Sequence, residues 1–231
     1  MPFAKTPFTS TVLPIPVTRL GAHPNVVMAV LAGRAGPITV EHTGASVTGD
    51  VLLVRPEVVH SVQLPERGAD VVYLNGLTFP YHAPLAVVLR GNLEALARRS
   101  IAGDTIASEE LRERLAFATD PLSAKMAAIV RAMQADPMRR VSQDELVRYL
   151  GMERTRALRA FKAATGLTFR RFKLWSALQH ATLRMAEREL VRTAAMDAGF
   201  ADTAHLSRVF SSMFGLCPSV AIAGLDERER E

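Results

Sequence analysis

The sequence lacks several features that would point to particular classes of protein. Cys217 is its only cysteine, so no disulfide can form within the chain, and the cysteine count gives no sign of secretion. No apolar run approaches the roughly 18–20 residues that are needed to cross a bilayer. Prolines interrupt the N-terminus where a signal peptide would be continuously apolar. We therefore expect a cytoplasmic protein with no membrane partner.

Strong compositional bias is also absent. The 231 residues are 48% hydrophobic and 22% charged, which is the balance of an ordinary globular protein. There is no solenoid repeat, and the one low-complexity segment is the charged tail at residues 226–231. The six histidines have no metal-ligand spacing, so we expect no metal, no cofactor and no catalytic residue.

The charge that is present is unevenly placed. Residues 1–120 hold 10 Lys and Arg against 11 Asp and Glu, whereas residues 121–231 hold 18 against 12. A neutral half joined to a basic half indicates a sensing or pairing domain joined to a domain that binds a polyanion. On charge alone, chance surface charge stays an alternative.

The first 80 residues have the pattern of β-strands. Short apolar runs are bounded by Gly and Pro, and the strongest, residues 50–55, ends at Pro56. This spacing predicts a small barrel or sandwich. From Pro84 the apolar period becomes helical, which predicts helices at residues 85–97, at 108–118 from an N-cap at Ser108, and from Pro121 to Gln134.

The C-terminal half contains one pattern twice: a helix, a glycine turn, a second helix and a final glycine. In the first unit the glycines are Gly151 and Gly166, and in the second they are Gly199 and Gly215. A long apolar-periodic segment, residues 169–188, joins the two units. The repetition predicts two helix-turn-helix units, each of which holds its second helix out for the DNA major groove.

The outward faces of these second helices carry groups that suit DNA. Arg can bond guanine bidentately, and Ser, Thr and His reach phosphates or base edges. Solvated Arg faces on a helical bundle would look similar, but two basic units on one long helix favour double-stranded DNA as the partner. The candidates are Arg154, Thr155, Arg156, Arg159 and Lys162 in the first unit, Arg171 as a phosphate contact, and Thr203, His205, Ser207 and Arg208 in the second unit.

Two stretches carry a resemblance to a known family. AAMDAGFADTAHLSRVFSSMFGLCPS, residues 194–219, closely resembles the C-terminal signature of the AraC/XylS family of bacterial transcription regulators. LGMERTRALRAFKAATGLTFRRF, residues 150–172, is similar to the family's first unit. The resemblance implies a domain of seven helices whose two recognition helices enter successive major-groove turns. By matched position it adds Leu158 and Ala204 to the base-reading candidates.

The first unit departs from the family pattern at three positions. Glu153 stands where a Ser cap is usual, and its charge can still favour the start of the helix. Ala157 stands where a core Leu is usual, and Ala177 stands where the joining helix usually has Arg.

The N-terminal half resembles the family's usual sensor fold in one segment. Residues 49–60, GDVLLVRPEVVH, look like the second half-motif of a cupin barrel. The first half-motif, with His-x-His and a following Glu, is not present. We therefore expect His60 to be a barrel or pocket histidine that contacts an effector, and not a metal ligand.

Together these features predict an α+β fold, with a small cupin-like β-barrel before an all-α domain. We predict a sensor barrel at residues 1–83, a helical linker with pairing helices at 84–135, an AraC-type DNA-binding domain at 136–222 and a charged tail at 223–231. The resemblance implies a homodimeric transcription regulator that answers to a small-molecule effector and can contact RNA polymerase. Three alternatives stay open: a cupin-type metal-dependent enzyme fused to a DNA-binding domain, a DNA-repair protein that uses Cys217, and an architectural protein without an effector.

Overall fold

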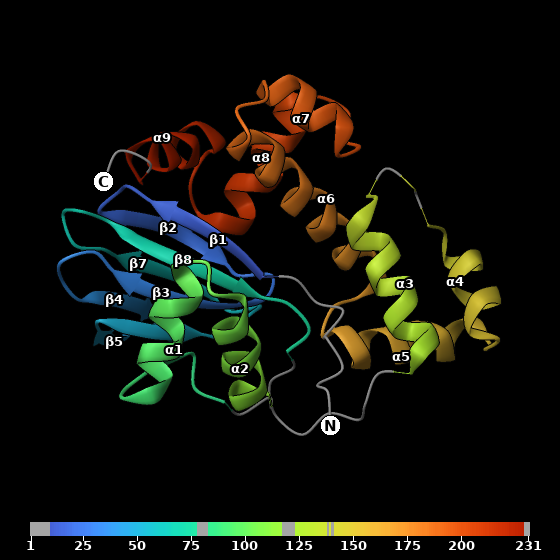
Figure 1. The fold of residues 1–231 in the computed structure, drawn as a ribbon, viewed down its shortest axis with the longest axis horizontal. Coiled ribbons are helices and arrows are strands. Elements are labelled where there is room, and N and C mark those ends of the chain that lie inside the picture. Colours follow the sequence, from blue (N-terminus) through green and yellow to red (C-terminus); the bar gives the residue numbers. More distant parts are fainter. Residues whose placement is uncertain (1–9, 78–82, 117–122, 138, 140, 229–231) are drawn as a thin grey trace.

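The N-terminal part of the protein is an antiparallel β-sandwich. A computed structural model describes residues 10–77, 83–116, 123–137, 139 and 141–228 (Figure 1). One sheet has the strand order β1-β8-β3-β6-β9 and the other has the order β2-β7-β4-β5. The strands are β1 (Ser10–Ile15), β2 (Arg19–Pro24), β3 (Met28–Gly33), β4 (Ile38–His42), β5 (Ala45–Gly49), β6 (Val51–Val54), β7 (Val59–Gln63), β8 (Ala69–Leu74) and β9 (Ala86–Val88).

The five-stranded sheet is apolar on both faces because both faces are covered. Successive side chains of a strand point to opposite sides, so Leu52 and Val54 join the core between the two sheets. Val51 and Leu53 join a second core, which also contains Leu96 of helix α1. Helices α1 (Asn92–Ile101) and α2 (Thr105–Leu115) therefore lie on the outer face of this sheet (Figure 1).

The prediction of a helix at residues 85–97 is partly wrong. Residues 86–88 form strand β9, which pairs with β6, and α1 begins only after Gly91, whose φ of 58° suits glycine. The apolar residues that fit a helical stripe there instead extend the sheet. Helix α2 also begins earlier than predicted, because Asp104, and not Ser108, accepts the capping bond from the backbone N–H of Ala107.

The C-terminal part is entirely helical, and within the described residues it contains seven helices. The two helix-turn-helix units and the long helix that joins them are confirmed. Asp120 and Pro121, which were expected to open the third helix, lie outside the described residues. The helices are α3 (Ala124–Ala135), α4 (Gln143–Leu150), α5 (Arg154–Thr165), α6 (Phe169–Ala186), α7 (Val191–Asp197), α8 (Thr203–Phe214) and α9 (Pro218–Arg228).

The long helix α6 separates the two units in space. At one end of α6, helices α4 and α5 lie beside α3, on the side of the molecule away from the sheets (Figure 1). At the other end, α8 packs against β2 and α9 packs against β1. The predicted fold class, α+β with an N-terminal β domain and a double helix-turn-helix domain, is confirmed.

No single helix in the described parts of the chain is long and apolar enough to cross a membrane, although α8 and the start of α9, bent by 69°, pass that test as a pair.

Candidate DNA-binding surface

Helix α5 buries its apolar face in the core and exposes its polar face to solvent. Phe161 is buried on its inner face, and its ring lies edge-on to Phe169 at 5.2 Å and to Phe172 at 5.3 Å between centroids. The five polar candidates of this unit are all exposed, as the sequence predicted. Leu158 differs from them because it is partly buried and packs against the core. The exposed residues are Arg154, Thr155, Arg156, Arg159 and Lys162.

The start of α5 is fixed by a carboxylate cap. The two carboxylate oxygens of Glu153 accept hydrogen bonds from the backbone N–H groups of Thr155, at 2.9 Å, and Arg156, at 3.1 Å. These bonds favour the charged form, so the pKa of Glu153 lies below its usual value, and nearby Arg159 lowers it further. The departure from a Ser cap therefore leaves this helix capped.

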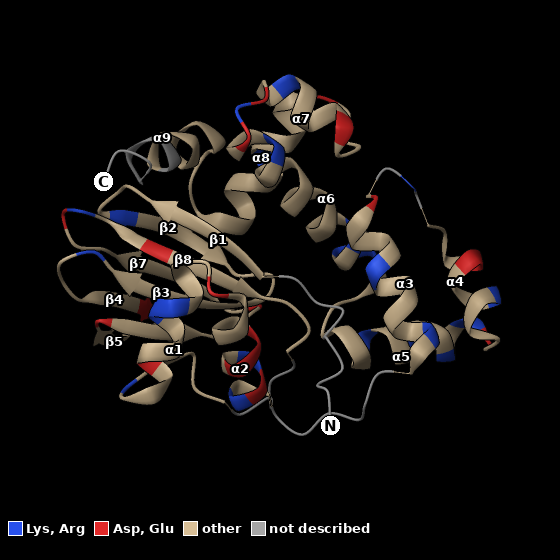
Figure 2. Ribbon diagram, viewed as in Figure 1, with Lys and Arg blue, Asp and Glu red and all other residues tan. Residues whose placement is uncertain are grey.

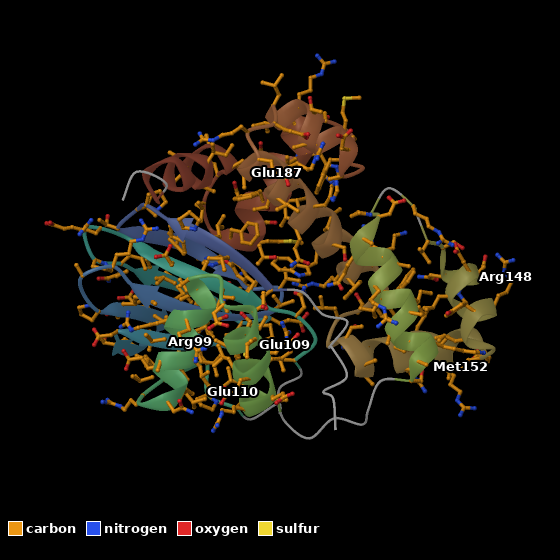
Figure 3. The ribbon with its side chains drawn as sticks, viewed as in Figure 1. Arg99, Glu109, Glu110, Arg148, Met152 and Glu187 are labelled. Atoms are coloured by element: carbon orange, nitrogen blue, oxygen red, sulfur yellow. The ribbon has the colours of Figure 1, made fainter. Side chains whose placement is uncertain are left out.

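Arg154 is held by the helix before it. Its Nη2 lies 2.5 Å from Oε1 of Gln143, and its Nη1 lies 3.6 Å from a carboxylate oxygen of Asp144. Arg148, on the outer side of α4, points away from the rest of the molecule (Figure 3). The first unit thus combines an arginine oriented by α4 with other exposed cations.

Helix α8 of the second unit follows the same plan. Its inner face is buried through Leu206, Phe210 and Phe214, and Asp202 caps it by accepting a bond of 2.6 Å from the N–H of His205. Of the candidates, three are exposed and two are half-buried. The exposed ones are Thr203, Ala204 and Arg208, and the half-buried ones are His205 and Ser207.

Charge is distributed differently over the two units. Lys and Arg recur along α5, whereas α7 carries both signs (Figure 2). Residues 143–165 of the first unit hold five Lys and Arg against three Asp and Glu, whereas residues 191–214 of the second hold two against two. The first unit therefore has the stronger positive character of the two.

An aromatic cluster joins the second unit to the β domain. Tyr73 of β8, Trp175 of α6 and Phe214 of α8 are all buried, and their ring centroids lie 5.1–5.7 Å from one another. Such contacts stabilise an interface beyond the area that they bury. From the sequence, Trp175 and Phe214 could be placed only on apolar helix faces, with no sign that the β domain covers them.

A hydrogen-bonded amide lies beside this cluster. The Oδ1 of Asn75 accepts a bond of 2.6 Å from Nε1 of Trp175, and its Nδ2 donates to Oε1 of Gln179 at 3.1 Å. Gln179 in turn donates to the hydroxyl of Thr11 at 2.5 Å, and buried Arg112 of α2 donates to the backbone oxygen of Asn75. Asn75 precedes Gly76, a pair that indicates a turn and gives no sign of this role.

His60 lies at the same interface. Its ring is 4.9 Å from that of His23, and both side chains are buried. Its Nδ1 donates to the carbonyl of Val58 at 2.8 Å, while Nε2 is buried with no hydrogen-bond partner in the described structure. Burial lowers the pKa of His60 to about 4, with a further contribution from His23 and His42, and it also lowers the pKa of His23. His23 is in close contact with Gly215 at the end of α8.

Arg171, predicted as a phosphate contact, has a carboxylate partner in the β domain. Its Nη1 lies 2.8 Å from Oε1 of Glu57, which sits in the turn between β6 and β7 with a φ of 65°. Both side chains are partly exposed, at 38% and 49%. No sequence pattern indicates that these two residues form a pair.

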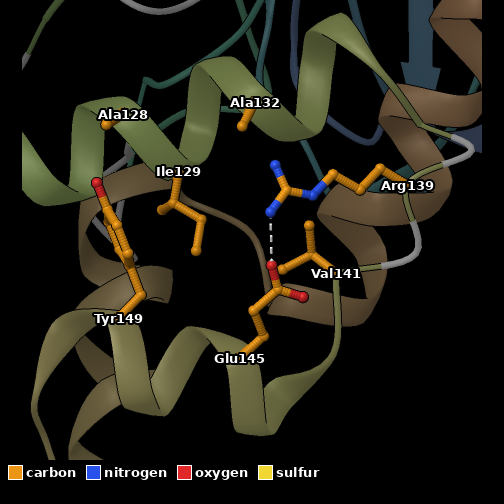
Figure 4. Close-up of a pocket in the computed structure, with 7 residues that line it drawn as sticks. All are labelled: Ala128, Ile129, Ala132, Arg139, Val141, Glu145 and Tyr149. Atoms are coloured by element: carbon orange, nitrogen blue, oxygen red, sulfur yellow. Dashed lines mark hydrogen bonds and ion pairs between the residues drawn. The ribbon is translucent and has the colours of Figure 1, made fainter.

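A cavity of about 170 Å³ lies between α3 and α4, and it contains none of the predicted site residues (Figure 4). Arg139 and Glu145 form an ion pair of 2.9 Å at one side of it. Its other lining residues are Ala128, Ile129, Ala132, Val141 and Tyr149. Among the side chains that the structure describes, no group of three His, Cys, Asp or Glu is placed to hold a metal ion.

Known proteins share parts of this architecture. Residues 146–223 match the family model of a helix-turn-helix domain. No curated protein sequence matches the chain. The fold is similar to that of ToxT from Vibrio cholerae, with 16% sequence identity, a TM-score of 0.59 and coverage of 96% of this chain and 99% of ToxT.

Two further structures of ToxT are similar to the same extent. The complex with (E)-4-(8-methylnaphthalen-1-yl)but-3-enoic acid has 14% identity, a TM-score of 0.61 and coverage of 94% of this chain and 99% of that one. The form bound to an unsaturated fatty acid has 14% identity, a TM-score of 0.58 and coverage of 93% and 94%. At these identities the likeness concerns the fold. Residues 146–223 thus form a helix-turn-helix domain, and the two-domain fold of the chain is similar to that of ToxT.

Proposed function

We propose that the protein binds double-stranded DNA by placing α5 and α8 in the major groove. The observation that carries this proposal is the pairing of two capped helices, each with its apolar face buried and its polar face exposed, on one continuous helix α6. Arg159 and Arg208 are exposed on these faces, where arginine can bond guanine bidentately. The base-reading candidates are Thr155, Leu158, Arg159, Thr203, Ala204 and Arg208, with the remaining polar candidates contacting phosphates.

Binding of selected duplexes tests this proposal. We expect Arg159→Ala and Arg208→Ala each to weaken binding at the selected site by about 1–3 kcal/mol and to relax the sequence preference there. Arg114→Ala, on α2 of the other half of the chain, removes the same charge and serves as the matched control. Binding by the wild-type chain should fall steeply with salt, because counterions are released from the phosphates. A wild-type chain with no salt-sensitive attraction to duplex DNA would contradict the proposal.

We further propose that a small-molecule effector controls this binding through the interface between the β domain and the second unit. Tyr73, Asn75 and His60 of the β domain lie at or near this interface, so a ligand that shifts the β domain also shifts α8. Two of the similar structures contain carboxylic acids, which supports an apolar carboxylic acid as the effector class. A homodimer formed through α1 and α2 stays a prediction of the family resemblance.

The only tryptophan of the chain provides the readout. Trp175 is buried at this interface, so its fluorescence should change when oleic acid binds and the interface loosens or tightens. Oleyl alcohol, which lacks the carboxylate, is the control ligand. If oleic acid changed neither the fluorescence nor the affinity for DNA, this effector class would be wrong, while the DNA-binding proposal would stand on its own test.

A further inference from the structure

Glu153 is an anion at the start of a strongly basic surface. It is exposed, it directly precedes α5, and the next 33 residues of the chain, Arg154 to Ala186, contain no other carboxylate. A negative charge at this place repels DNA phosphates, whereas a neutral Ser could cap the helix without this repulsion. We therefore ask what else the carboxylate of Glu153 can bind.

The carboxylate is held in a fixed position. Each of its two oxygens accepts one backbone N–H at the first turn of α5, from Thr155 and from Arg156. A carboxylate has about four acceptor sites, and the Thr155 hydroxyl occupies one more of them, so capacity for about one further bond remains. Because the lowered pKa keeps the group ionised, Glu153 can only accept hydrogen bonds near neutral pH.

We propose that Glu153 is a specificity-determining residue that accepts a hydrogen bond from the N4 amino group of a cytosine in the part of the binding site read by α5. This inference rests on the proposed function, in which α5 enters the major groove. The N-terminal residues of a recognition helix are those that reach base edges, and cytosine N4 is the donor that carboxylates read there.

The same carboxylate discriminates against guanine and thymine. Guanine and thymine present the acceptors O6 and O4 in the major groove, and an acceptor facing a fixed anion is unfavourable. Specificity then arises from rejection as much as from attraction. The surrounding cations Arg156, Arg159 and Lys162 supply the attraction to the backbone that the anion reduces.

The experiment is selection of bound sequences from a random duplex pool with the full chain. For the wild type we expect a cytosine enriched at one position. Glu153→Ser, which can still cap the helix, should lose a preference of about fivefold to tenfold at that position alone. Glu153→Gln should shift the preference toward adenine, which Gln bonds at N6 and N7. Glu153→Asp keeps the charge and a good capping group but is one methylene shorter, so it should also lose the cytosine preference.

The matched control is Asp104→Ser. Asp104 caps α2 with a bond of 2.9 Å from the N–H of Ala107, so this change alters an equivalent cap in the other half of the chain. It should leave the selected sequences unchanged. The inference is overturned if the Ser, Gln and Asp variants at position 153 select the same sequences as the wild type, even if their affinity rises uniformly. If the wild-type chain selects no duplex at all, the proposed function itself fails, which is a distinguishable result.

Discussion

The two helix-turn-helix units share a plan but differ in their surroundings. In each, a carboxylate caps the second helix and an αL glycine ends it. The first unit packs on α3 and α6, at the far side of the molecule from the sheets. The second unit packs on the β domain, with α8 against β2 and α9 against β1. Two units with the same local structure therefore differ in their packing. The unit at one end of α6 lies away from the sheets, and the unit at the other end packs on the β domain.

This difference indicates where control of DNA binding can act. The β domain contacts α8 through Phe214 and α6 through Trp175, so we expect movement of the β domain to reach both helices. The second unit contacts Tyr73 and His23 of the β domain, whereas the joining helix α6 bonds Asn75 through Trp175 and, at the end next to the first unit, pairs Arg171 with Glu57. The following changes separate the two environments.

The largest effect is expected from Gly215→Ala. The φ of Gly215 is 72°, and an added Cβ would lie 2.5 Å from Nδ1 of His23, whose ring is fixed by a bond to the carbonyl of Gly21. We expect a loss of unfolding free energy of about 3 kcal/mol, from left-handed strain plus displacement of a packed ring. Urea unfolding followed by circular dichroism measures it.

Gly151→Ala is the matched change in the first unit. Its φ is 66°, but nothing lies within 4 Å of the added Cβ, so only backbone strain of about 1 kcal/mol is expected. Equal losses for the two variants would show that the docking of α8 on His23 contributes little, and would remove the contrast between the units.

The second effect is a pH dependence that arises from His60 of the β domain. The pKa of His60 is about 4 in the folded protein and near its ordinary value of 6.5 when unfolded, because burial disfavours the imidazolium. The unfolded chain therefore takes up the proton first as the pH falls. Stability should be complete above about pH 6.5 and should decline toward pH 4, by about 2–3 kcal/mol from this group.

Unfolding free energies between pH 7.5 and pH 4.5 measure this dependence, with Trp175 fluorescence as the probe. The variant His60→Gln should reduce the slope of this profile, and the slope that remains includes the contribution of buried His23. An unaltered slope in His60→Gln would assign the acid sensitivity to other groups. In that case the buried histidine pair would not determine the loss of stability at acid pH.

The local features of both units could be predicted from the sequence, and their docking could not. Capping residues, αL glycines and apolar periodicity act within a few residues, so Gly151, Gly166 and Gly215 marked the helix ends correctly. The exposed faces of α5 and α8 followed from the same periodicity. Leu158, His205 and Ser207 are the exceptions, since they are partly buried.

The predictions failed for residues whose structure depends on contacts with residues far away in the sequence. An apolar stripe at residues 85–89 satisfies a helix and an edge strand equally well, and pairing with β6 selects the strand. Asn75 and Glu57 lie 100 and 114 residues from their partners Trp175 and Arg171, and polar residues in turns carry no mark of such a distant contact. The interface that joins the domains is therefore visible only in three dimensions.

The smallest effect is expected from Glu57→Gln, which frees the first unit from its one described ion pair with the β domain. Arg171 would then be available to a DNA phosphate in the proposed complex. Since the pair is partly exposed, it contributes about 0–1 kcal/mol, which corresponds to a gain in DNA affinity of up to about fivefold. The gain should shrink as salt is raised, because both the pair and the phosphate contact are screened.

Glu66→Gln separates local competition from a change in net charge. Glu66 is exposed in the turn between β7 and β8, and its substitution alters the charge of the chain equally. A gain shared by both variants would reflect long-range electrostatics, whereas a gain only in Glu57→Gln would reflect release of Arg171. Adding Arg171→Ala to Glu57→Gln should abolish the gain, because the freed side chain is then missing. If the gain survived in that double variant, Glu57 would act on the first unit by some route other than Arg171.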